Sequence, residues 1–93
     1  MKASRVYRER KLVGDDAFVE IVIWDVPQPV VGSTHGYKYS LALIVADRCR
    51  LRYDNERGKG DHRHLGDHES GYVFRDLATL LADFWKDVEA YLQ

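Results

Sequence analysis

The sequence has few of the residues and segments that mark secreted or membrane proteins. It contains a single cysteine, Cys49, among 93 residues, which excludes an internal disulfide and agrees with a reducing compartment. Its longest nearly apolar run, Leu41–Ala46, is far too short to cross a bilayer. The charged start at Met1–Arg5 has no apolar signal-peptide core. We therefore predict a cytoplasmic protein with no membrane contact, and Cys49 as a small apolar residue on a strand.

Proline is also scarce, and repeats and low-complexity tracts are absent. Apolar residues make up 45% and charged residues 31%, which is the composition of a globular chain. The length fits a single domain over residues 1–93. A domain of this size buries only roughly 60–65% of the surface that its unfolded chain exposes, so a tightly bound partner would stabilise it.

Period-two patterns predict an antiparallel sheet of about four to five strands. The predicted strands are residues 4–12, 18–26, 37–46 and 49–53, with short additions around His62–Leu65 and at Tyr72–Phe74. We place turns at Gly14–Asp16 and Asp47–Arg48, and a loop between the prolines after the second strand and Gly36. In the strand at 49–53 we place Cys49, Leu51 and Tyr53 on one face.

The C-terminal residues carry the clearest helical pattern. Apolar side chains recur there every three or four positions, at Leu77, Leu80, Leu81, Phe84, Trp85, Val88, Tyr91 and Leu92. Asp76 is the expected N-cap. The fold class is therefore α+β, with one C-terminal amphipathic helix packed on one face of the sheet. Such a sheet leaves a face and edges exposed, which a second copy or another protein partner could cover.

Charge is unevenly distributed along the chain. Residues 1–66 carry 12 lysines and arginines against 9 acidic residues, whereas residues 67–93 carry 2 against 6. Arg8 and Arg10 share one strand face, and we place Arg50 and Arg52 together on another. If both faces are the one that the helix leaves open, they form a basic surface suited to an RNA backbone. The alternative is an ordinary solvated face.

The polar segment Tyr53–Tyr72 holds three of the four histidines. On an extended strand His62 and His64 point the same way, with Arg63 opposite. The pair could act as general acid and base in RNA cleavage. It could also bind a transition metal, with His68, Asp54, Asp61 or Asp67 completing the ligands, or it could be structural. We favour metal-independent acid–base chemistry, with no metal and no cofactor, because His-x-His alone is a weak metal signature.

The neighbours of the histidines complete the predicted site. Lys59 lies between two glycines, where it can meet a phosphate or simply be solvated in a hairpin loop. Asp54 or Asp61 would orient an imidazole. The predicted catalytic residues are His62, His64, Lys59, Asp54 and Asp61. The predicted substrate-binding residues are Arg52, Asn55, Arg63, Arg50 and Tyr53. Turn formation is the alternative for Asn55 and packing for Tyr53, and we assign no function to His35.

The string Arg52-Tyr-Asp-Asn-Glu56 followed by Gly58-Lys-Gly-Asp-His-Arg-His64 resembles the TumE-like toxins of bacterial toxin–antitoxin pairs. The likeness covers nearly the whole chain, including the stretches at 17–20, 22–24, 26–27, 36–39 and 76–84. It implies a growth-inhibiting toxin encoded beside a DNA-binding antitoxin of the helix-turn-helix type. Ribonuclease activity is expected by analogy with other small toxins. The positions that match the motif are Asp54, Asn55, Lys59, Asp61, His62 and His64.

Two other functions fit the same residues. The protein could be a non-enzymatic module whose sheet and loop dock an antitoxin or a cellular target. It could also be a metal-dependent nuclease.

Overall fold

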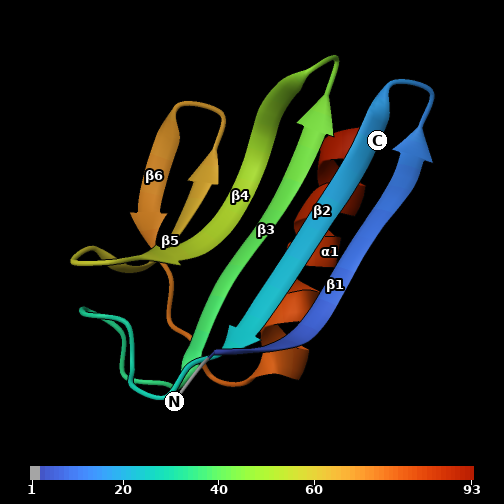
Figure 1. Ribbon diagram of the computed structural model, residues 1–93. Helices are drawn as coiled ribbons and strands as arrows, with labels where there is room; N and C mark the ends of the chain where they lie inside the picture. The colour runs from blue at the N-terminus through green and yellow to red at the C-terminus, as the bar shows by residue number, and fades with distance from the viewer. Residues whose placement is uncertain (1–2) are drawn as a thin grey trace.

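The computed structural model describes residues 3–93 as a six-stranded antiparallel sheet followed by one helix (Figure 1). Each strand pairs with the next one along the chain, in the order β1-β2-β3-β4-β5-β6. The elements are β1 Ser4–Gly14, β2 Ala17–Asp25, β3 Tyr37–Val45, β4 Arg48–Glu56, β5 Gly60–Leu65, β6 His68–Gly71 and α1 Leu77–Leu92. The α+β class is confirmed, with six strands rather than four to five.

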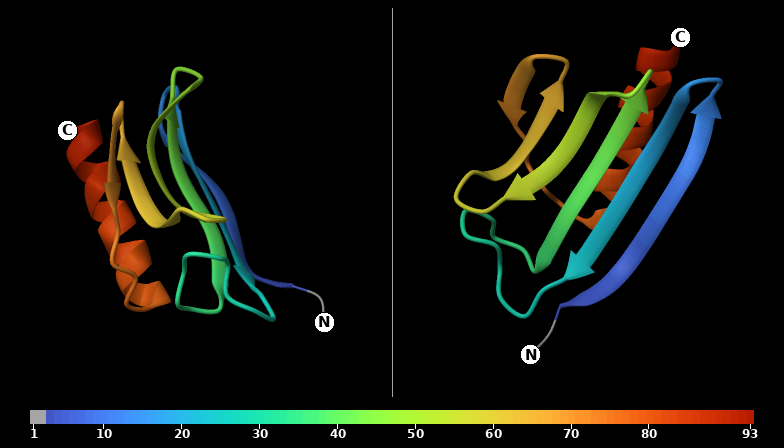
Figure 2. Two further views of the ribbon diagram at one scale, coloured as in Figure 1. Left: turned by 90° about the vertical axis from the view of Figure 1, so that its left-hand side faces the viewer. Right: turned by 45° about the horizontal axis from the view of Figure 1, so that its top comes forward.

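The helix α1 lies against one face of the sheet and leaves the other face bare, which we call the uncovered face (Figure 2). Apolar residues of the three central strands β2, β3 and β4 meet α1 through Leu80, Phe84 and Val88. These three helical residues recur every four positions, so they form the stripe that the sequence pattern predicts. Among residues 3–93, no helix has the length and apolar character needed to span a membrane.

Asp76 caps the start of α1, as predicted. Its backbone is extended, and its carboxylate accepts the N–H of Thr79 at 2.7 Å. The same contact holds the pKa of Asp76 below its usual value, because the hydrogen bond favours the ionised form. The prediction of a strand at Tyr72–Phe74 is wrong. These residues connect the sheet to α1, and the chain must leave the last strand here to reach the covered face.

The turn between β3 and β4 lies one residue earlier than predicted. Ala46 and Asp47 have φ of 50° and 64°, and two positive φ angles suit a two-residue hairpin turn. The register then shifts, because Leu43 pairs with Leu51 but Ile44 pairs with Cys49, so Arg50 is an inserted residue. This bulge separates Cys49 from the face of Leu51, and Cys49 is exposed rather than packed in the core.

The loop at residues 26–36 packs against the turn between β4 and β5. The N–H of Gly58 donates to the carbonyl of Val31 at 2.7 Å. A Cβ added at Gly60, where φ is 75°, would lie 2.8 Å from the carbonyl oxygen of Gly32. Gly60 therefore allows two backbone segments to approach closely, whereas Gly58 has open space around it and takes a positive φ of 85°. Close packing thus accounts for Gly60, and backbone conformation for Gly58.

Candidate functional site

Three ionisable side chains gather on the uncovered face where β4 pairs with β5. Asp54 of β4 lies opposite His62 of β5, and Arg52 lies opposite His64. The structure thus places both histidines on one face, as their spacing predicts. Ligand atoms of Asp54, His62 and His64 all lie within 4.8 Å of one another. We call these three residues the Asp–His–His group.

His62 is the buried member, with 4% of its surface exposed. Its Nδ1 lies 2.9 Å from the carbonyl oxygen of Gly60, and its Nε2 lies 2.7 Å from Oδ1 of Asp54. The second contact is close enough for an ion pair but lacks the alignment of a hydrogen bond. Within residues 3–93, His62 Nε2 and Asp54 Oδ1 are both buried atoms without a hydrogen-bond partner. The contact is therefore one of proximity, and neither polar atom is satisfied by it.

His64 is the accessible member of the group. About a third of its side chain is exposed, and its ring meets that of His62 edge to face with centroids 4.7 Å apart. On its other side, Nδ1 lies 3.6 Å from a carboxylate oxygen of Glu69 in β6. The two imidazoles are in contact, so they form one compact site.

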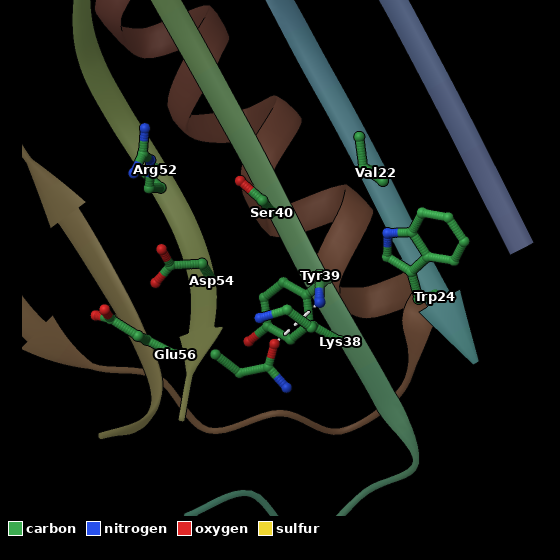
Figure 3. Close-up of a pocket in the computed structure, with 9 residues that line it drawn as sticks. Val22, Trp24, Lys38, Tyr39, Ser40, Arg52, Asp54 and Glu56 are labelled. Atoms are coloured by element: carbon green, nitrogen blue, oxygen red, sulfur yellow. Dashed lines mark hydrogen bonds between the residues drawn. The ribbon is translucent and has the colours of Figure 1, made fainter. Parts of the chain in front are cut away.

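The uncovered face beside this group is rich in cations. Arg8 and Arg10 pair with Val22 and Glu20 of β2, and this places both arginines on the same face as Arg52. A shallow hollow of about 240 Å³ opens between β2 and β4 (Figure 3). Side chains around it include Trp24, Lys38, Ser40, Arg52, Asp54 and Glu56. Arg8, Arg10 and Arg52 thus share one face, together with Glu20 at 3.9 Å from Arg10, whereas Arg50 is the half-buried bulge residue.

Asp61 is separated from the Asp–His–His group by the sheet itself. It accepts hydrogen bonds from Ser33 Oγ at 2.5 Å, Tyr39 OH at 2.7 Å and His35 Nε2 at 2.7 Å. The ring of His35 also stacks on Phe74, with centroids 3.8 Å apart. Burial and the bond to Asp61 raise the pKa of Tyr39. Asp61 therefore fastens the loop at residues 26–36 to β5, and His35 is one of the loop residues that it holds. The sequence around His35 gives no sign of this structural role.

Asn55 also serves the backbone. It is 1% exposed, and its Oδ1 accepts the N–H of Tyr39 at 2.9 Å (Figure 3). Its Nδ2 donates to the carbonyl of Tyr37 at 2.6 Å. The side chain thus extends the β3–β4 hydrogen bonds beyond the last paired residues, Ser40 and Asp54. Asn55 is thus a strand residue that ties β4 to the start of β3, and not part of a turn.

Tyr53 and Arg63 lie on the covered face and join the sheet to α1. Arg63 Nε donates to Asp87 Oδ2 at 2.7 Å, and the hydroxyl of Tyr53 donates to the same oxygen. The bond to Asp87 raises the pKa of Arg63, while burial and then Asp87 raise that of Tyr53. Lys59 lies in the β4–β5 turn, largely exposed, with Glu56 at 3.7 Å. Of the predicted residues, only Arg52, Asp54, His62 and His64 gather at one place.

The fold and site define a small open-faced α+β domain with a compact ionisable centre on a sheet face that carries several arginines. The profile of the family described as toxin TumE matches residues 2–92. The chain therefore belongs to the TumE toxin family, which is the toxin component of a toxin–antitoxin pair. Comparisons with curated proteins and with solved structures return no significant match.

Proposed function

We propose that this toxin is an endoribonuclease that binds RNA across the uncovered face and cleaves it at the Asp–His–His group. The observation that carries the proposal is the position of this group. It lies beside the hollow lined by Arg52 and Lys38, on the one face that α1 leaves bare. Cations on a sheet attract the phosphate backbone, and an ionisable cluster next to them can act on a bound phosphodiester.

Half-buried aromatic side chains of β2 on this face suit single-stranded RNA. Trp24 lines the hollow beside Lys38, and Phe18 lies under the guanidinium of Arg10 at 4.3 Å. Bases stack on such rings while arginine and lysine contact the phosphates between them. The hollow itself is shallow and open, which suits an extended chain better than a small enclosed substrate.

The contact between the two imidazoles bears on how cleavage would occur. An acid and a base that act on opposite sides of one phosphate need room for that phosphate between them. His62 and His64 meet edge to face, and His62 is nearly inaccessible. The geometry therefore supports a reacting centre in which the three residues act together rather than two separate proton carriers.

The test is cleavage of a labelled single-stranded RNA by the purified protein. We expect the wild type to cut, His64→Ala to lose nearly all cleavage, and Arg52→Gln to lose part of it through weaker binding. His68→Ala is the matched control, because His68 is exposed on β6 and pairs with Leu65, on the opposite face from His64. The ribonuclease proposal would be refuted if the wild type stops growth but leaves RNA intact and His64→Ala stops growth equally well. That result would favour a binding module.

We also propose that the partner is a DNA-binding antitoxin of the helix-turn-helix type and that the pair acts in the cytoplasm. An antitoxin that neutralises this toxin would cover the uncovered face or the edge strand β1. All but two of the eleven residues of β1 are exposed. Co-purification of a His-tagged antitoxin with the toxin, and its loss on Arg8→Glu and Arg10→Glu, tests coverage of the basic face. A toxin that pairs only with itself would instead support the homodimer.

A further inference from the structure

We propose that Asp54, His62 and His64 form a binding site for one divalent transition-metal ion, for which Zn²⁺ is the test ion. The proposal deepens the ribonuclease function but rests on the geometry of three side chains alone. It replaces the metal-independent chemistry favoured by the sequence, in which no fixed carboxylate could be assigned to the two histidines.

The protonation of His62 provides the first argument. The carbonyl oxygen of Gly60 can only accept, so the hydrogen bond at 2.9 Å requires a proton on Nδ1 of His62. In the neutral ring, Nε2 then carries a lone pair. That lone pair lies 2.7 Å from a carboxylate oxygen of Asp54, which is also an acceptor. Two acceptors at this distance repel each other unless a cation lies between or beside them.

A second proton on His62 does not fully resolve this contact. An N–H at Nε2 would point along the ring plane, and the contact with Asp54 lacks hydrogen-bond alignment. Both atoms are shielded from solvent, so water does not satisfy them either. A metal ion can lie off the line between the two atoms and still bond to both, because coordination joins ligands at an angle.

The surroundings match those of metal-binding histidines. A ligating histidine usually donates its second N–H to a backbone carbonyl or a carboxylate, which fixes the ring. Gly60 supplies that carbonyl for His62, and Glu69 places a carboxylate beside Nδ1 of His64. Gly60 is itself held by its close packing on Gly32. His62 is therefore pre-oriented, with its free nitrogen held beside Asp54.

The donor set indicates the class of ion. Two imidazoles and one carboxylate suit zinc and its first-row neighbours, whereas Mg²⁺ and Ca²⁺ prefer oxygen alone. Bond lengths near 2.0–2.2 Å set zinc ligands about 3–4 Å apart. The three ligand atoms, all within 4.8 Å of one another, need only small side-chain shifts to reach such spacing. The partial exposure of His64 and Asp54 leaves the site open toward bound RNA.

The primary experiment measures Zn²⁺ binding to the purified full-length protein by competition with a chromogenic chelator, without RNA. We expect one ion per chain, at least tenfold weaker binding for both Asp54→Asn and His64→Asn, and unchanged binding for His68→Asn. Cys49→Ser is a further control, because Cys49 lines a hollow with His64 and thiolates bind zinc. Co²⁺ provides a second readout through visible bands of an ion with nitrogen and oxygen ligands.

The results separate the two proposals. Equal zinc affinity in wild type and Asp54→Asn, or loss of zinc on Cys49→Ser alone, would overturn the proposed site. Circular dichroism of each variant distinguishes loss of ligand from loss of fold. Zinc binding without any RNA cleavage would leave the site standing and refute the ribonuclease. Full-rate cleavage by a protein that binds no zinc would instead leave the ribonuclease standing and overturn the metal site.

Discussion

Replacement of Asp61 by asparagine tests whether this residue is structural. Asp61 is one of the residues predicted to be catalytic, yet it lies on the covered side with 8% of its side chain exposed. Its carboxylate accepts hydrogen bonds from Ser33, His35 and Tyr39. Asparagine keeps one acceptor oxygen and puts an N–H₂ group toward the remaining donors. With that oxygen toward His35 and Tyr39, the N–H₂ group faces the hydroxyl of Ser33, which then loses its acceptor.

The expected cost follows from these contacts. Hydrogen bonds to a charged group are each worth about 1.5–3 kcal/mol, and a buried unsatisfied group costs about 1–3 kcal/mol. We expect Asp61→Asn to lower the free energy of unfolding by about 2–4 kcal/mol. For a domain of this size that corresponds to a fall in melting temperature of roughly 10–25 °C. Zinc affinity measured well below the melting temperature should change less than threefold.

Thermal and urea denaturation followed by circular dichroism measure this loss, with Glu56→Gln as the matched control. Glu56 is 63% exposed and its carboxylate pairs with the exposed Lys59, so its replacement should cost at most about 0.5 kcal/mol. An Asp61→Asn protein that melts with the wild type would show that the three hydrogen bonds do not hold the loop. A stable Asp61→Asn protein that no longer binds zinc or cleaves RNA would return Asp61 to the reacting centre.

Three further predictions address the core, the covered tyrosines and the basic face. Phe84→Ala should destabilise the protein by about 3–5 kcal/mol, measured by urea denaturation, because Phe84 is fully buried where α1 meets the sheet; a loss below 1 kcal/mol would contradict this packing. Tyr39 and Tyr53 have pKa values raised above 10.0, so their neutral forms stabilise the fold below pH 10 and that stability is lost as pH rises further. The ultraviolet absorbance of their phenolate forms should therefore appear only as the protein unfolds. Ionisation of either tyrosine near pH 10 in the folded protein would refute this prediction. The double substitution Arg8→Gln and Arg10→Gln should weaken RNA binding. The slope of log K against log salt concentration should become shallower by about 0.7 per lost phosphate contact. Nitrocellulose filter binding at several salt concentrations measures this slope, and an unchanged slope would show that RNA does not contact these arginines.

Much of the fold follows from the sequence because its central elements have strong periodicity. The apolar stripe of α1 and the alternation in β2 and β3 leave little choice of structure or of buried face. The strands β5 and β6 were only partly predictable, since both of their faces carry polar residues. The bulge at Arg50 was not predictable, because the local alternation continues through it and only the pairing with β3 shows the shift.

The site shows the same division. The period of two that aligns His62 with His64 also places Asp61 and Arg63 on the opposite face, so the separation of the five predicted catalytic residues was implicit in the sequence. Asp54 could be placed opposite His62 only through the length of the β4–β5 turn. The role of His35 depends on the loop folding back across 26 positions, which no local pattern indicates.

The uneven charge of the chain has a structural explanation in the contact between α1 and the sheet. Asp87 accepts from Arg63 and Tyr53, and Asp83 accepts from the hydroxyl of Tyr72 at 2.6 Å. The acidic C-terminal helix thus places carboxylates where they pair with the covered face, and Arg63 is neutralised there. The arginines of β1 and Arg52 project from the other face and have no such helix beside them. A single helix therefore divides the charge of the chain between two faces. Its carboxylates pair with the covered face, while Arg8, Arg10 and Arg52 remain on the uncovered face with the Asp–His–His group.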